Sequence, residues 1–125
     1  MADAPIRVLV VDDNPDMRES TRRLLENLGY QVETAPDGAA ALRAHMARYV
    51  DVVLTDIFMA GTEGMETIAT FKRSWPDLRV VAMSGGGTLS KKDYLEAALQ
   101  VGADATLQKP FTLQALVAAL KDGKG

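Results

Sequence analysis

Two short apolar runs, each followed directly by aspartate, constrain this chain more than any other feature of its sequence. Residues 6–11 are Ile-Arg-Val-Leu-Val-Val and precede Asp12 and Asp13, and residues 52–55 precede Asp56. Apolar runs of this length are typical of strands that helices cover on both faces. If the two strands lie side by side and parallel, the three carboxylates meet at one edge of the sheet. A divalent cation or an ammonium group must then offset their charge, and the oxygen ligands indicate Mg²⁺.

Strand and helix patterns alternate along the rest of the chain. Further strands are predicted at 31–35, 79–83 and 105–108, and each strand is followed by apolar or small residues at helical spacing. The helices are predicted to begin at Asn14 with Pro15, at Asp37, near Met65, at Ser90 and at Thr112, and to end at Gly29, at Trp75 with Pro76, and at Gly102. Their apolar stripes are predicted to contain Met17, Leu24, Leu25 and Leu28; Ala40, Ala41, Ala44 and Ala47 or Met46; Met65, Ile68, Ala69 and Phe71; Leu95, Ala98 and Leu99; and Leu113, Leu116, Val117 and Leu120. Five βα units of this kind predict an α/β fold with a doubly wound parallel sheet.

Length and composition narrow the class of protein. With 125 residues, 47% of them hydrophobic, the chain is expected to form one domain over 1–125, with a core over about 6–121 and short flexible termini. The net charge is −3 and no Lys/Arg-rich run is present, which disfavours nucleic-acid binding. There is no cysteine, so neither a disulfide nor a thiolate metal site can form. The apolar run near the N-terminus is too short for a signal peptide or a membrane span, and a cytoplasmic protein is expected.

Doubly wound sheets bind ligands beyond the carboxyl ends of their strands. Polar residues follow the predicted strands at these ends. These residues are Asp12, Asp13, Asp56, Ser84 and Lys109. Carboxylates can hold Mg²⁺, one carboxylate can attack phosphorus, and a hydroxyl and an ammonium group can bind the phosphoryl oxygens. The set predicts phosphoryl transfer to an aspartate.

Four short motifs carry a resemblance to a known family. They are V-V-D-D-N-P, V-L-T-D-I-F-M, A-M-S-G and Q-K-P-F, in this order and at the ends of the predicted strands. With them, the chain resembles a receiver domain of the response regulators of two-component systems, similar to the stand-alone chemotaxis type. The resemblance covers essentially the whole chain and implies a flavodoxin-like sheet of order 2-1-3-4-5 with five helices.

The resemblance also implies roles for the site residues. Asp56 would take a phosphoryl group from a phosphohistidine of a histidine kinase or a histidine phosphotransfer protein. Asp13, Asp56 and the carbonyl of Phe58 would ligate Mg²⁺, with Asp12 acting largely through water. Ser84 and Lys109 would bind the phosphoryl group, and the Lys109–Pro110 peptide would be cis. The domain would catalyse its own phosphorylation and dephosphorylation without being a turnover enzyme, and its fourth helix and last two strands would contact a downstream protein target that the sequence does not identify.

Some positions depart from the family pattern. Thr106 stands where the family often has a tyrosine or phenylalanine whose rotamer reports phosphorylation. Ala60 follows Met59, where the family usually has a proline in the loop after the phosphoacceptor. Phe58 and Gly86 occupy positions that tune phosphoryl lifetime in the family, and a bulky Phe58 favours slow hydrolysis. The aromatic half of the usual switch is therefore missing.

Other interpretations stay open beside the receiver. A Mg²⁺-dependent aspartyl-phosphate phosphatase resembles D-x-D, but the second acid is replaced by Phe58. A degenerate receiver would act as a phosphorylation-independent protein interaction module. His45 lies between Arg43 and Arg48, so a solvated helix face is predicted for it rather than a phosphodonor role, and Trp75 is expected to be partly buried.

Overall fold

The computed structural model describes residues 5–57, 63–84, 91–109 and 111–121, with the backbone alone for 63 and 91–95. The described strands are β1 (Arg7–Val11), β2 (Gln31–Ala35), β3 (Val52–Asp56), β4 (Arg79–Ser84) and β5 (Ala105–Gln108). The described helices are α1 (Pro15–Asn27), α2 (Gly38–Ala47), α3 (Glu63–Ser74), α4 (Lys91–Gln100) and α5 (Leu113–Leu120). All strand pairs are parallel and the sheet order is β2-β1-β3-β4-β5, which confirms the predicted doubly wound fold.

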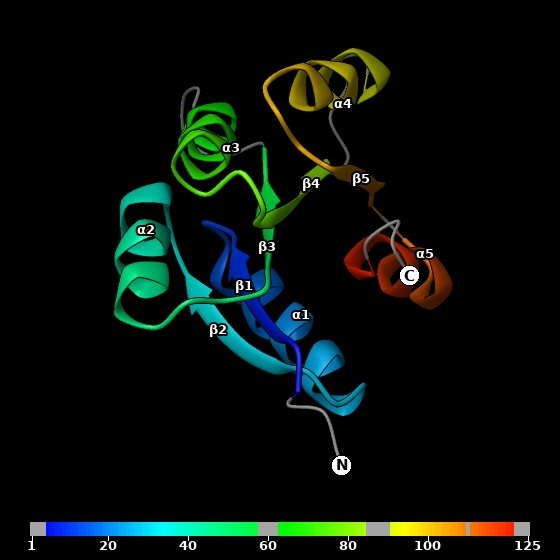
Figure 1. Cartoon of the computed structure of the whole chain (residues 1–125). Helices are drawn as coiled ribbons and strands as arrows, with labels where there is room; N and C mark the ends of the chain where they lie inside the picture. Colours follow the sequence, from blue (N-terminus) through cyan, green and yellow to red (C-terminus); the bar gives the residue numbers. More distant parts are fainter. Residues whose placement is uncertain (1–4, 58–62, 85–90, 110, 122–125) are drawn as a thin grey trace.

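Helices cover both faces of the sheet and enclose two apolar cores. Figure 1 shows α2, α3 and α4 on one side of the strands and α1 and α5 on the other. Along the central strand β3, Val53 belongs to the core beneath α2, α3 and α4, and Val52 and Leu54 belong to the core beneath α1 and α5. This alternation is the two-residue period of a strand. Every residue of β3 is buried. The nearly all-apolar sequence of this strand follows from cover on both faces.

Capping residues fix the helix boundaries as predicted. Asn14 Oδ1 accepts hydrogen bonds from the backbone N–H groups of Asp16 and Met17, at 2.9 and 3.1 Å, and Pro15 follows as the first helical residue. Asp37 and Thr112 cap α2 and α5 in the same manner. Gly29 follows α1 with a φ of +98°, a conformation that favours glycine. The predicted start at Ser90 and the Lys109–Pro110 bond lie outside the described residues.

The prediction that His45 lies on a solvated helix face was wrong. His45 is only 3% exposed, and its Nδ1 atom accepts a hydrogen bond from the Val50 N–H at 3.0 Å. Its helix α2 turns Gly38, Ala41 and His45 toward the core, while Met46, named as an alternative to Ala47 in the apolar stripe, is 67% exposed. The imidazole is tolerated inside because its acceptor nitrogen is satisfied by the backbone.

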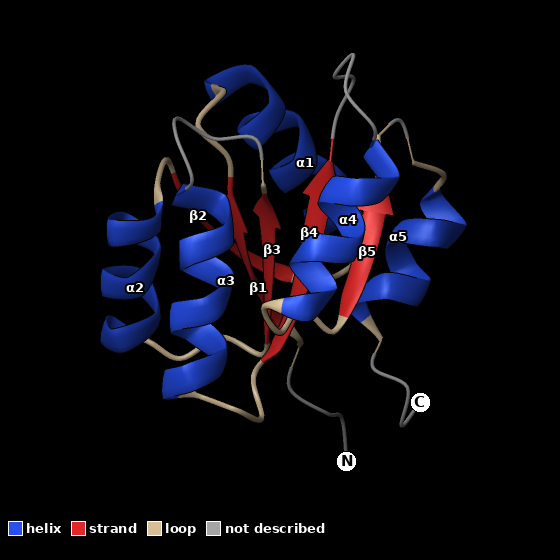
Figure 2. Ribbon diagram, turned by 90° about the horizontal axis from the view of Figure 1, so that it is seen from above, coloured by secondary structure: helices blue, strands red, loops and turns tan. Residues whose placement is uncertain are grey.

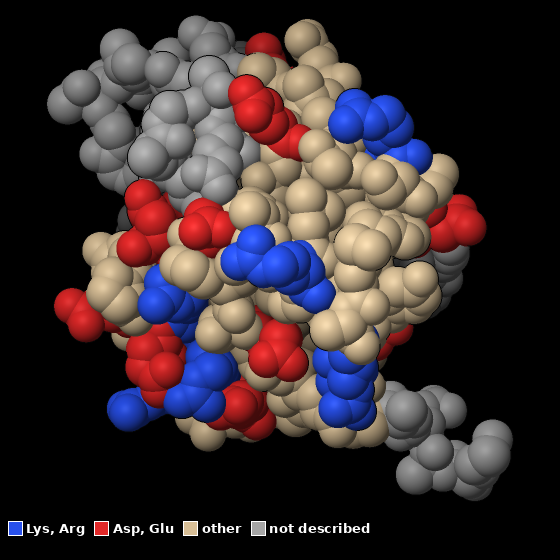
Figure 3. Space-filling model, turned by 90° about the vertical axis from the view of Figure 1, so that its left-hand side faces the viewer, with Lys and Arg blue, Asp and Glu red and all other residues tan. Residues whose placement is uncertain are grey.

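Several other apolar residues of the predicted stripes also lie at the surface. Met17, Leu28, Leu99 and Leu113 are exposed, and buried Thr21 instead faces the core from α1. Acidic and basic side chains are interspersed on the face shown in Figure 3. Among the described residues, no helix is both long and apolar enough to cross a membrane.

Candidate functional site

The pairing of β1 with β3 brings two of the predicted carboxylates together. Val11 is in register with Thr55, so Asp12 and Asp56 come next on neighbouring strands. Figure 2 shows the carboxyl ends of the strands at one edge of the sheet. Both aspartates are buried, although carboxylates are rarely buried without a partner. The site therefore needs a compensating positive charge.

Lys109 supplies that charge from the end of β5. Its Nζ atom lies 2.9 Å from Asp56 Oδ2 and 3.3 Å from Asp12 Oδ2, and its side chain is 13% exposed. One ammonium group thus bridges two carboxylates that lie far from it, and from each other, in the sequence. Because water is largely excluded, this contact is less screened than an exposed ion pair.

Lys109 stays protonated because of these contacts. Burial has the largest single influence on its pKa and acts to lower it. The hydrogen bond and charge of Asp56, together with the charge and hydrogen bond of Asp12, outweigh burial and raise the pKa of Lys109 above its ordinary value. The side chain is therefore a fixed cation at neutral pH.

Backbone contacts hold the acidic loop and the lysine in position. The Lys109 N–H donates to the Ser84 carbonyl at 2.8 Å, which ties the ends of β4 and β5 together. The Asn14 N–H donates to Asp12 Oδ1 at 3.0 Å, and Arg18 Nη1 donates to the Asp12 carbonyl at 2.8 Å. Sequence reasoning missed Arg18. The signal available was its place in α1, one helical turn after the cap at Asn14.

Ser84 ends β4 at the same edge, and its side chain is fully buried. Among the residues that the structure describes, the Ser84 hydroxyl has no hydrogen-bond partner. A buried hydroxyl without a partner costs about 1–3 kcal/mol. Such a group is suited to bind a polar ligand that enters the site.

The structure gathers only part of the predicted metal-ligand set. Asp13 follows Asp12 but is exposed. Within the described part of the chain, no three His, Cys, Asp or Glu side chains lie close enough to hold a metal ion by themselves. Phe58, Ala60 and Gly86 lie outside the described residues, and Thr106 is partly buried in β5. The assignment of Asp12, Asp13, Asp56 and Phe58 as metal ligands stays a prediction.

Comparison with known proteins defines the family. The family model of the response regulator receiver domain matches residues 8–121, and the chain belongs to this family of two-component signalling domains. The response regulator MprA of Mycobacterium sp. strain KMS is 37% identical over 117 residues, which are 94% of this chain and 50% of that protein. The chain thus spans about half the length of the curated relatives it matches.

Solved structures confirm the receiver fold. A response regulator receiver domain protein from Clostridium thermocellum is 32% identical with a TM-score of 0.82, and the match covers 92% of this chain and 90% of that one. The chemotaxis protein CheY4 of Vibrio cholerae is 29% identical with a TM-score of 0.80, and the match covers 94% of this chain and 97% of that one. Both similarities extend over nearly the whole domain.

Proposed function

We propose that Asp56 accepts a phosphoryl group from the phosphohistidine of a partner histidine kinase or histidine phosphotransfer protein. The observation that carries the proposal is the partly buried contact of 2.9 Å between Asp56 Oδ2 and the Lys109 ammonium, at the same edge of the sheet as the Ser84 hydroxyl, which has no partner among the described residues. The Lys109 cation stands where negative charge would develop. Phosphorylation would change the surface that the domain uses for protein contacts, as the family resemblance implies.

The proposed step exchanges one phosphorus bond for another. An oxygen of Asp56 forms a bond to phosphorus while the bond between phosphorus and the donor histidine nitrogen breaks. The electron pair of the broken bond stays on the imidazole nitrogen, which takes a proton from water. Lys109 and Ser84 bind phosphoryl oxygens, so the chain contributes positioning and charge neutralisation.

The donor chemistry of the site fits Mg²⁺. Asp12 and Asp56 offer hard carboxylate oxygens, and the one ammonium group that contacts both, Lys109, cannot by itself neutralise them together with the neighbouring Asp13. We assign the ion to Asp13, Asp56 and the carbonyl of Phe58, with Asp12 acting largely through water. A bound Mg²⁺ would neutralise charge on the phosphoryl oxygens.

The proposed output is a rearrangement that starts at Ser84. Since the Lys109 N–H is bonded to the Ser84 carbonyl, an inward movement of Ser84 would also act on the end of β5. The surface formed by β4, α4 and β5 would change and contact an unidentified downstream protein. In this proposal, residues 1–125 act as one domain that modifies itself and has no separate substrate. The cytoplasmic location predicted from the sequence stays a prediction.

The experiment is phosphorylation of the chain by acetyl phosphate and Mg²⁺, with beryllofluoride as a stable mimic. We expect NMR shift changes at Ser84, Lys109 and β5 in the wild type, and their loss in Asp56→Asn. Asp77→Asn is the matched control, because Asp77 is exposed and lies between α3 and the start of β4, at the opposite edge of the sheet from Asp56. A wild-type chain that neither binds Mg²⁺ nor responds to the mimic would contradict the proposal.

A phosphorylation-independent interaction module is the second candidate function. It is favoured by Thr106, which leaves β5 without an aromatic side chain at this position. In that case, a partner captured by the wild type would bind Asp56→Asn equally well, with or without beryllofluoride. Affinity measurements on these four combinations separate the two functions.

A further inference from the structure

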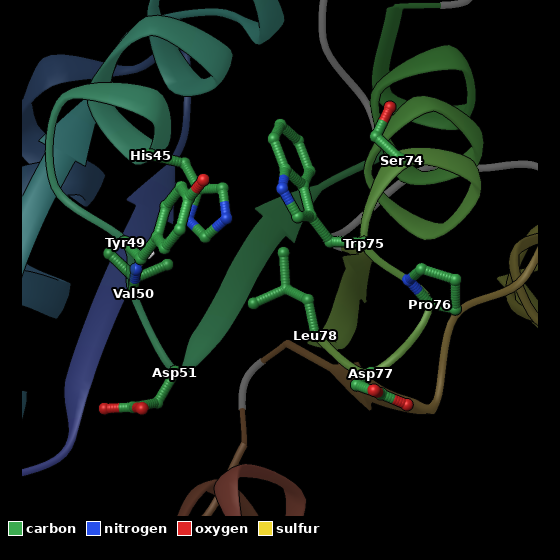
Figure 4. A pocket seen from close by; sticks show the side chains of 9 residues that line it. All are labelled: His45, Tyr49, Val50, Asp51, Ser74, Trp75, Pro76, Asp77 and Leu78. Atoms are coloured by element: carbon green, nitrogen blue, oxygen red, sulfur yellow. Dashed lines mark hydrogen bonds between the residues drawn. The ribbon is translucent and has the colours of Figure 1, made fainter.

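A hollow lies at the amino ends of the strands, at the opposite edge of the sheet from Asp56. We call it the amino-edge pocket. It has a volume of about 400 Å³ and is lined by the end of α2, the connection to β3, and the connection from α3 to β4. Figure 4 shows its lining side chains. The volume falls in the range of small-ligand sites.

Three aromatic rings line the amino-edge pocket. The His45 ring stacks on Tyr49 with centroids 4.8 Å apart, and Trp75 meets His45 edge-on at 4.5 Å. Tyr49 is 66% exposed, so much of its ring surface is open to a ligand. Aliphatic Val50 and Leu78 also line the pocket. Exposed aromatic rings next to aliphatic groups fit a ligand with an apolar portion.

Hydrogen bonds fix the connection that carries Tyr49 and Asp51. The Val50 N–H donates to His45 Nδ1 at 3.0 Å, and Arg7 Nε donates to the Tyr49 carbonyl at 3.1 Å. The Asp51 N–H donates to the Arg7 carbonyl at 2.9 Å, and Asp51 Oδ2 accepts from the Arg7 N–H at 2.8 Å. This wall is therefore held in place before any ligand binds.

The wall that carries Trp75 is held in the same way. Lys72 Nζ donates to the carbonyls of Pro76 and Leu78 at 2.9 and 2.8 Å, and the Leu78 N–H donates to the Trp75 carbonyl at 3.0 Å. Since both walls are fixed, a ligand would not have to order them.

Two carboxylates stand at the mouth of the amino-edge pocket. Figure 4 shows Asp51 and Asp77 on either side of Leu78. Among the described residues, neither carboxylate forms an ion pair. Arg79 and Lys121 line a neighbouring hollow that shares both aspartates, and Arg79 Nε donates to the Ala119 carbonyl at 2.8 Å. The two carboxylates thus lie next to the aromatic rings, and the side shared with the neighbouring hollow also carries the cations Arg79 and Lys121.

We propose that the amino-edge pocket binds a compact organic cation, a guanidinium or ammonium group on a short apolar stem. The cation would lie against Tyr49 and Trp75, whose ring faces attract positive charge, and within reach of the two carboxylates. Burial lowers the pKa of His45, so its ring is neutral at neutral pH and does not repel the cation. The pocket does not share residues with the Asp56 site, and this inference holds whether or not Asp56 is phosphorylated.

The same chemistry can come from a free small molecule or from an arginine side chain of another protein. n-Butylguanidinium represents the first source and N-acetyl-arginine amide the second. Their neutral analogues, n-butylurea and N-acetyl-citrulline amide, keep the shape and remove the charge. The comparison therefore measures both the dependence on charge and the preferred source.

The experiment is an NMR titration of the full, unphosphorylated chain with these four compounds. Trp75 is the only tryptophan, so its indole N–H signal reports on the pocket directly. We expect saturable shifts at Trp75, Val50 and Leu78, with a dissociation constant of about 1 mM or tighter for one of the cations. Tighter binding of the blocked arginine indicates a protein ligand, and tighter binding of n-butylguanidinium indicates a free small molecule.

Three variants provide the test of mechanism. Asp51→Asn keeps an oxygen that can accept the Arg7 N–H, and Asp77→Asn removes the other charge; each should weaken cation binding about twofold to fivefold. Glu33→Gln is the matched control, because Glu33 is exposed on the edge strand β2 and does not line the pocket. Equal shifts with the neutral analogues, no saturable shift with either cation, or equal weakening by Glu33→Gln would overturn the proposal.

Discussion

The two edges of the sheet each bury a titratable nitrogen base, with opposite results. At the carboxyl edge, Lys109 is partly buried between Asp12 and Asp56, and its pKa is raised. At the amino edge, His45 is buried among aromatic rings, and its pKa is lowered. Burial alone opposes charge in both places. Opposite charges within hydrogen-bonding distance therefore decide whether a base that is shielded from water is a fixed cation or a neutral ring.

The largest expected change in stability comes from a substitution in the packed residues at the amino edge of the sheet. Phe71 is fully buried, and its ring lies 5.8 Å from His45 and 5.7 Å from Trp75 between centroids. Phe71→Ala should lower the free energy of unfolding by about 3–5 kcal/mol, because it removes apolar contacts and leaves a cavity. Urea denaturation measures the change. Leu113→Ala, at a 48% exposed position, is the control and should change stability by no more than about 0.5 kcal/mol.

The next largest change in stability is expected when the charge balance at the carboxyl edge of the sheet is altered. Lys109→Met keeps the aliphatic stem but leaves Asp12 and Asp56 facing each other without a cation, which should cost about 2–3 kcal/mol in a chelator-containing buffer. Adding Asp56→Asn to Lys109→Met should restore part of the loss. If the double variant is no more stable than the single one, repulsion between the carboxylates is not the cause.

The pH dependence of the same pair has a definite sign. The pKa of Lys109 is raised above its ordinary value of 10.5 by its carboxylate partners. Its stabilising contribution is therefore fully present below pH 10.5 and is lost as the pH rises through the folded-state pKa. Lys109→Met should lack this alkaline loss in denaturation curves recorded up to that range.

His45 is expected to make a smaller contribution to the pH dependence of stability, and this contribution has the opposite sign. Because its folded-state pKa lies below 6.5, the unfolded chain binds the proton first, and stability falls as the pH drops below that value. His45→Asn offers an amide oxygen to the Val50 N–H and does not titrate, so the fall in the urea midpoint should be shallower. Tyr49→Phe keeps the histidine and should keep the wild-type slope. Equal slopes in all three proteins would show that His45 is not the titrating group.

The smallest effect concerns the buried hydroxyl of Ser84. Since the described residues provide no partner for Ser84 Oγ, Ser84→Ala should leave the free energy of unfolding within about 0.5 kcal/mol or raise it. Thr55→Val is the contrasting variant, because Thr55 Oγ1 donates to the Asp56 carbonyl at 3.2 Å, and it should cost about 1 kcal/mol. A loss in Ser84→Ala as large as in Thr55→Val would mean that the hydroxyl already has a partner in solution.

The central strands and the charged site could be predicted because local signals agree there. A strand such as β3 is apolar throughout and ends in an acid, so its bounds and its burial follow from the residue types. Parallel strands then place Asp12, Asp56 and Lys109 at one edge without knowledge of the side-chain contacts. The contact between Lys109 and both carboxylates had to come from the structure, since it depends on which strands are neighbours.

The amino edge could not be predicted to the same extent because its residues are chemically ambiguous. The arginines on either side of His45 suggest a solvated face, yet the spacing of Gly38, Ala41 and His45 is that of one helix face. Small residues at 38 and 41 leave room for a large ring at 45. Conversely, Met46 and Leu113 are apolar but exposed, because apolar character alone does not say which face meets the core.

The position of β1 between β2 and β3 has a consequence for how the chain could be divided. Within the described sheet, the pairing of β1 with β3 is the only strand pairing that joins the residues up to α2 to those from β3 onward. A chain cut between α2 and β3 would leave Asp12 on one fragment and both Asp56 and Lys109 on the other. The receiver fold therefore lends itself to fragment complementation, in which the charged site forms only when the two pieces reassociate.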